Sequence, residues 1–173
     1  LIAGEASFFG GRNIELTEPF SVMDAFELNT ETLVFSASEN LKLSGDIMFR
    51  EISSSDQPRV VLMSGGSFEA ASGLSLDAAM NDLVLSARGD LSLQSAYLAA
   101  DREVSVIGMR DLNLNDVQVN ASRLTTLKAA KDLYVDSLRF NQNLPKIVME
   151  ATTIRLRNID FPAAAQVNLN SLK

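Results

Sequence analysis

Apolar residues recur along this chain at a fixed step of 21 residues. The step is visible in three columns, made of Leu91, Leu112, Leu133 and Ile154, of Leu93, Leu114, Val135 and Leu156, and of Leu98, Val119, Phe140 and Phe161. Self-similarity at a period of this size indicates a solenoid, a propeller or an array.

Each repeat contains three short triplets in which a polar residue separates two apolar ones. In the clearest repeat they are residues 104–106, 112–114 and 117–119. This alternation places both apolar side chains on one face of a strand. Turn-forming residues stand between the triplets, at 108–111 and 115–116. The pattern predicts a closed triangular coil with an apolar centre.

The triplets extend from residue 14 to residue 169 and predict about seven coils. The third-strand positions step by 21, 27, 22, 21, 21 and 21 residues, through Phe26, Ile47, Leu74, Ala96, Val117, Leu138 and Ile159. A polar segment at 51–59 accounts for the long step as an inserted loop, since insertions in solenoids map to loops.

Helices need apolar residues three and four apart, and leucine-rich repeats need a recurring motif that this chain lacks. We therefore predict an all-β, single-stranded parallel β-helix (a β-solenoid) of about seven three-strand coils of ~21 residues, right-handed by the general rule for parallel connections. The β-helix domain covers residues 14–173. Residues 1–13, with Ile2, Phe8 and Phe9, are expected to form an N-terminal cap.

Composition excludes several kinds of chemistry. The chain has no Cys and no His, so thiol nucleophiles, thiolate metal sites and imidazole catalysis are absent. A net charge of −7 and a pI of about 4.6 discourage nucleic acid and anionic membranes as partners. No apolar stretch approaches the length of about 18 residues that a membrane span requires. Hydrophobic residues make up 46%, enough for a continuous core.

The two ends of the sequence predict an incomplete solenoid. The chain begins at Leu1, and residues 167–169 open a coil that stops at Lys173. We expect a piece of a longer solenoid, or a solenoid that lacks its cap. A stack of parallel coils has unpaired strand edges at its ends, so the segment 167–173 is expected to be covered by a downstream segment or to associate end to end with another molecule.

Asp90, Asp111 and Asp132 precede the second strand in successive coils. Stacked coils would place them in a column with a step of about 5 Å, and such carboxylates are candidate ligands for Ca²⁺. Asp is also a residue whose side chain accepts hydrogen bonds from the backbone at turns. We favour this turn-stabilising role over calcium binding for the three aspartates. No other metal site and no cofactor site are predicted.

Two short sequence motifs also occur in the chain. Arg88-Gly89-Asp90 spells the tripeptide that integrins recognise, and Asn120-Ala121-Ser122 is an N-glycosylation sequon. Gly89 and Asp90 are already explained by the turn, so we interpret the tripeptide as coincidental. The sequon is interpreted as incidental.

No catalytic residue is predicted. Charged residues are spread over outward and corner positions at the solenoid spacing, for example Asp116, Asp136, Asp160, Arg139 and Arg157. Tyr97 and Tyr134 are the only Tyr residues and there is no Trp, so a platform for stacking sugars is poorly supplied.

The repeat, with its polar corners and Leu-x-Leu strands, resembles secreted bacterial β-helices of the filamentous-haemagglutinin and autotransporter-passenger type. The resemblance implies a non-enzymatic extracellular or cell-surface protein that acts as a spacer or an adhesin for a surface glycan or a protein receptor. Two alternatives stay open: a polysaccharide-binding or polysaccharide-degrading β-helix, and a self-assembling scaffold, because the chain also resembles bactofilin-like cytoskeletal β-helices.

Overall fold

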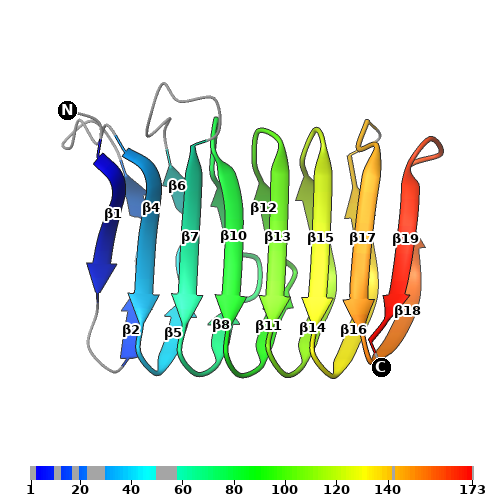
Figure 1. The fold of residues 1–173 in the computed structure, drawn as a ribbon, viewed down its shortest axis with the longest axis horizontal. Helices are drawn as coiled ribbons and strands as arrows, with labels where there is room; N and C mark the ends of the chain where they lie inside the picture. The colour runs from blue at the N-terminus through cyan, green and yellow to red at the C-terminus, as the bar shows by residue number, and fades with distance from the viewer. Residues whose placement is uncertain are drawn as a thin grey trace.

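The computed structural model describes residues 3–9, 13–16, 20–22, 30–49, 58–141 and 143–172. In these residues the regular elements are β-strands, stacked side by side along one axis, with β1 at one end and β19 at the other (Figure 1). The predicted fold class, an all-β parallel β-solenoid, is confirmed. No helix long and apolar enough to cross a membrane occurs in the described residues.

One face of the solenoid is an eight-stranded parallel sheet. Its strands, in spatial order, are β1 (Ala3–Phe9), β4 (Thr30–Ala37), β7 (Arg59–Ser64), β10 (Asp82–Ala87), β13 (Glu103–Gly108), β15 (Leu124–Ala129), β17 (Lys146–Ala151) and β19 (Gln166–Ser171). Each strand therefore pairs with its counterpart in the next coil.

The other two faces are joined into a second sheet. The second face contains β2 (Asn13–Leu16), β5 (Asn40–Leu43), β8 (Phe68–Ala70) and β11 (Leu91–Gln94), and the third contains β3 (Phe20–Val22), β6 (Ile47–Phe49), β9 (Ser75–Asp77) and β12 (Tyr97–Ala99). Three long strands run through both faces: β14 (Leu112–Asn120), β16 (Asp132–Phe140) and β18 (Thr153–Asp160). The first half of β14 pairs with β11 and its second half with β12.

A residue with positive φ forms the corner between the second and third faces in five coils. These residues are Gly73 (φ 84°), Ser95 (49°), Asp116 (51°), Ser137 (61°) and Asn158 (53°). A left-handed residue turns the chain within one position, and Gly, Asn and Asp are among the residues best suited to it. The polar corner residues of the sequence therefore have a backbone role.

The predicted inward columns form the core. Leu91, Leu112 and Leu133 are stacked in register and fully buried, and Leu93, Leu114 and Val135 are buried beside them. In the last of these coils Ile154 and Leu156 are only partly buried, because β18 is paired with β16 alone in the described residues. The predicted stacking is confirmed.

The first face ends in a column of small buried residues that the sequence analysis did not single out: Ala37, Ser64, Ala87, Gly108, Ala129 and Ala151. The chain turns sharply here, and a Cβ added to Gly108 would stand 2.6 Å from the carbonyl oxygen of Asp111. The Ser64 hydroxyl lies 2.7 Å from the carbonyl oxygens of Glu39 and Ser67. Tight closure of this corner explains the column.

The amino-terminal end of the stack is formed by β1. Within residues 1–13, which were predicted to cap the stack, residues 3–9 form this strand, and it pairs in parallel with β4. With eight strands in the first sheet, the stack differs slightly from the seven coils predicted. Most of the predicted loop at 51–59 lies outside the described residues, and Arg59 already belongs to β7.

The third-strand register also differs near this end. The sequence places Phe26 opposite Ile47, whereas the structure pairs Phe20 with Ile47 and Ile47 with Leu76. Phe26 itself lies outside the described residues. Both 20–22 and 26–28 show the apolar-polar-apolar pattern, so only the strand pairing decides between them.

We predict that Leu112→Asp destabilises the protein by several kcal/mol, because Leu112 is fully buried between Leu91 and Leu133 and the new carboxylate would have no partner there. Asn113→Asp, one position along on the outward side of β14, is the control and should change stability by no more than about 0.5 kcal/mol. Urea denaturation measures both. Equal stability of the Leu112→Asp variant and the parent would disprove the core assignment.

Thr125 is fully buried in the column between Val104 and Ile147, and its hydroxyl has no hydrogen-bond partner. A buried unpaired hydroxyl costs about 1 kcal/mol or more. We therefore expect Thr125→Val to raise the free energy of unfolding by about 1 kcal/mol. Thr126→Val, on the outward side of the same strand, serves as the control. A lower melting temperature for Thr125→Val than for the parent would contradict this prediction.

Candidate binding groove

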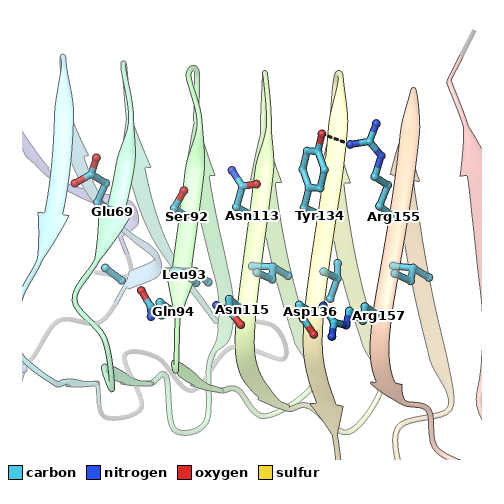
Figure 2. A pocket seen from close by; sticks show the side chains of 14 residues that line it. Glu69, Ser92, Leu93, Gln94, Asn113, Asn115, Tyr134, Asp136, Arg155 and Arg157 are labelled. Carbon is cyan, nitrogen blue, oxygen red and sulfur yellow. Dashed lines mark hydrogen bonds and ion pairs between the residues drawn. The ribbon is translucent and has the colours of Figure 1, made fainter.

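Outward side chains of the second face form two rows that run along the solenoid axis. One row consists of Glu69, Ser92, Asn113, Tyr134 and Arg155, and the other of Gln94, Asn115, Asp136 and Arg157 (Figure 2). Both rows follow from strand alternation, because these residues flank the inward-facing residues Leu93, Leu114, Val135 and Leu156. The second row stands immediately before the left-handed corner residues.

The rows border a groove of about 590 Å³. Its lining also includes Ala70, Leu93, Leu114, Val135 and Leu156, which stand between the rows along the same strands and pack with their side chains against the core. The groove extends from β8 to β18, which is about 19 Å at the usual strand spacing of about 4.8 Å. It is therefore suited to an extended ligand lying parallel to the axis.

The centre of the groove carries unused hydrogen-bonding capacity. The side chains of Ser92, Gln94, Asn113 and Asn115 make no hydrogen bond with other residues that the structure describes. An amide offers two N–H donors and an acceptor oxygen, and a hydroxyl is both donor and acceptor. These groups can bind a neutral polar ligand from both sides of the groove.

The end of the groove over β16 and β18 is organised by Tyr134 and two arginines. The Arg155 guanidinium carbon lies 4.9 Å from the centre of the Tyr134 ring, and its Nη1 donates a hydrogen bond to the Tyr134 hydroxyl. Arg157 Nη1 is 3.8 Å from Asp136 Oδ2. Asp136 Oδ1 in turn accepts hydrogen bonds from Asn158 Nδ2 (3.0 Å) and Ser137 Oγ (3.2 Å).

The candidate carboxylate column lies outside this groove, at the first corner. Asp90 Oδ1 accepts a long hydrogen bond from the backbone N–H of Asp111 (3.4 Å), and Asp111 Oδ1 accepts one from Asp132 (3.3 Å). Arg110 Nε is 3.6 Å from Asp90 Oδ1. Within the described part of the chain, no three His, Cys, Asp or Glu side chains gather into a group that could hold a metal ion. The column thus joins successive coils through side-chain to backbone bonds.

The two short motifs are also part of the stacking contacts. In Arg88-Gly89-Asp90, the Asp90 carboxylate is engaged as described above, and Gly89 N–H donates to the Gly66 carbonyl. In the sequon, Asn120 Nδ2 donates to the Tyr97 hydroxyl and Asn120 Oδ1 accepts from Asn141 Nδ2. Asn120 is therefore held in a ladder of side chains along the third corner.

Of the charged residues considered for catalysis, the structure brings Asp136 and Arg157 to the groove. Arg139 and Asp116 form a separate ion pair of 3.3 Å, and Asp160 is exposed at the end of β18. Sequence reasoning missed the groove, because it treated all outward positions as ordinary solvent-exposed surface. The signal it could have used is the shared register of Ser92, Asn113, Tyr134 and Arg155.

The outward side of the first face has its own ladder of interactions. Lys128 Nζ is 3.0 Å from Glu150 Oε2, and Asn170 Nδ2 donates to Glu150 Oε1 at 3.1 Å. The hydrogen bond from Lys128, followed by that from Asn170, holds the pKa of Glu150 below its ordinary value of 4.5. These three residues connect β15, β17 and β19 and stabilise the stacking of the strands.

Comparisons with protein-family models, with curated proteins and with solved structures found no match.

We predict that the aspartate column stabilises the fold without a metal. Asp111→Ala should cost about 1 kcal/mol, the usual net value of one hydrogen bond, whereas Asp111→Asn keeps an acceptor oxygen and should cost less. Melting curves of the parent should be the same in calcium and in a chelator. A rise in melting temperature with calcium that Asp111→Asn abolishes would reveal a calcium site instead.

Proposed function

We propose that this protein is a non-enzymatic extracellular or cell-surface rod of the adhesin or spacer type, which binds a linear glycan along the groove of its second face. The observation that carries the proposal is a set of four polar side chains, Ser92 and Asn113 from one row and Gln94 and Asn115 from the other. They make no hydrogen bond with other described residues and border a straight groove about 19 Å long. A rod built of stacked coils presents such a groove without any loop having to fold over it.

A glycan fits this surface better than a protein receptor does. Sugar hydroxyls donate and accept hydrogen bonds, as the groove amides do, and both rows of the groove carry such amides. Protein interfaces usually depend on a few anchors near their centre, most often Trp, Tyr or Arg. In this groove Tyr134, Arg155 and Arg157 lie at one end, and the centre carries small polar side chains. The large apolar residues that are exposed in the described part of the chain do not line the groove; they are Met48, Met63, Met80, Met109 and Leu169.

The arrangement of carboxylates supports binding without hydrolysis. Glycoside hydrolases commonly place two carboxyl groups about 5 to 9.5 Å apart across the scissile bond. The carboxylates of this groove, Glu69 and Asp136, stand three strands apart, which is about 14 Å. Asp136 also accepts two hydrogen bonds from its own coil and its neighbour.

Binding to a panel of linear oligosaccharides long enough to fill the groove tests the proposal. We expect at least one to bind, and Asn113→Ala combined with Asn115→Ala to weaken that binding by about tenfold or more, since each lost hydrogen bond is worth about 1 kcal/mol. Gln118→Ala is the matched control, because Gln118 is exposed on the same strand but belongs to the third face.

Two results would overturn this function. If no oligosaccharide of the panel binds, the proposed glycan binding is wrong. Cleavage of a bound oligosaccharide that Asp136→Asn abolishes would make the protein an enzyme. Calorimetry and product analysis by chromatography, done on the same samples, distinguish these results from the expected one.

A further inference from the structure

The groove carries different charges at its two ends. Glu69 borders it over β8, the middle is neutral, and Arg155 and Arg157 border it over β18. The two ends are separated by about 19 Å, which exceeds the Debye length of about 8 Å at physiological salt. Each end therefore acts on the nearest part of a bound ligand. Two guanidinium groups on one strand also stand out in a chain with a net charge of −7.

The arginine end keeps a surplus of positive charge. Arg155 contacts the neutral Tyr134 and has no carboxylate partner among the described residues. The Arg157 side chain is 78% exposed, and the one ion pair that it makes with a described residue, Asp136, is long at 3.8 Å. Asp136 already accepts hydrogen bonds from Ser137 and Asn158. Most of the N–H donors of both arginines are therefore available to an anion.

Tyr134 holds Arg155 in place for such a contact. The guanidinium lies over the ring and donates to the hydroxyl of the same residue, so its orientation is fixed by two interactions. A guanidinium positioned in advance loses less entropy when it binds a carboxylate or a sulfate, which it can contact through two parallel hydrogen bonds. Tyr134 is thus a positioning residue for Arg155.

We propose that the ligand is an acidic linear polysaccharide, whose anionic group, a uronate carboxylate or a sulfate ester, binds between Arg155 and Arg157. The inference rests on the proposed glycan-binding function and adds the class of ligand. The neutral hydroxyls of the same chain contact the amides in the middle of the groove. Glu69 repels an anionic group at the opposite end, so the charge pattern also favours one direction of binding.

The test measures the affinity for three oligosaccharides of equal length: a neutral one, a uronate-containing one and a sulfated one. We expect an acidic oligosaccharide to bind more tightly than the neutral one, with an affinity that falls as salt is raised. Arg155→Gln combined with Arg157→Gln should weaken its binding by about tenfold or more, the scale of lost charge-assisted hydrogen bonds, and leave the neutral oligosaccharide unaffected.

Two further variants make the test specific. Arg139→Gln removes an exposed arginine of the third face and should change no affinity. Tyr134→Phe keeps the ring but removes the hydroxyl that accepts from Arg155, so it should weaken binding of the acidic oligosaccharide and spare that of the neutral one. Preferential binding of the uronate or of the sulfate identifies the anionic group, and either supports the inference.

The outcomes separate the inference from the function on which it rests. If the neutral and acidic oligosaccharides bind equally and the double arginine variant changes neither, the inference is wrong, while loss of binding in the Asn113→Ala and Asn115→Ala variant would still support glycan binding. If no oligosaccharide binds, both proposals fail. Melting curves of each variant establish that it is folded.

Discussion

In-register pairing of parallel strands is the constraint on which the whole molecule depends. Leu91 pairs with Leu112, Leu112 with Leu133 and Leu133 with Ile154, so each coil places equivalent positions above one another. The side chain at an inward position must then pack against the equivalent side chains of the coils before and after it, because the coil interior is narrow and closely packed. This accounts for the persistence of Leu, Val and Ile inside and of small residues at the first corner.

The same register also stacks the outward side chains, with a different result at the corners and on the second face. At the corners, stacked polar side chains satisfy one another or the backbone, as Asn120 does with Asn141 and Asp90 with the N–H of Asp111. On the second face, Asn113 and Asn115 are stacked in the same manner, but their amides bond nothing in the described chain. A ladder that satisfies itself stabilises the fold, and one that does not leaves donors and acceptors for a ligand.

The sequence predicts the solenoid well because apolar alternation and the repeat report on burial directly, as at Leu112 and Leu114. It cannot decide between the similar triplets at 20–22 and 26–28, since the choice depends on which strand the neighbouring coil pairs with. The groove was harder to foresee. Ser92, Asn113, Tyr134 and Arg155 occupy equivalent positions but differ in chemical type, so no recurring residue marks them. The Arg155 contact with Tyr134 depends on side-chain orientations across two coils, which the pattern of the sequence does not encode.

The one-dimensional stacking of the coils also bears on how the chain folds. Each strand of β10 to β18 pairs only with the equivalent strands of adjacent coils, 20 to 23 residues away along the chain. Among the described strands, no pairing joins parts of the sequence more than one coil apart, so a first folded coil can serve as a template to which neighbours add one at a time. Such a chain resembles a linear array with nearest-neighbour coupling, in which stability grows with the number of coils and fraying starts from the ends. The groove extends over five successive strands, from β8 to β18. It would therefore be completed one strand at a time as coils add to the stack.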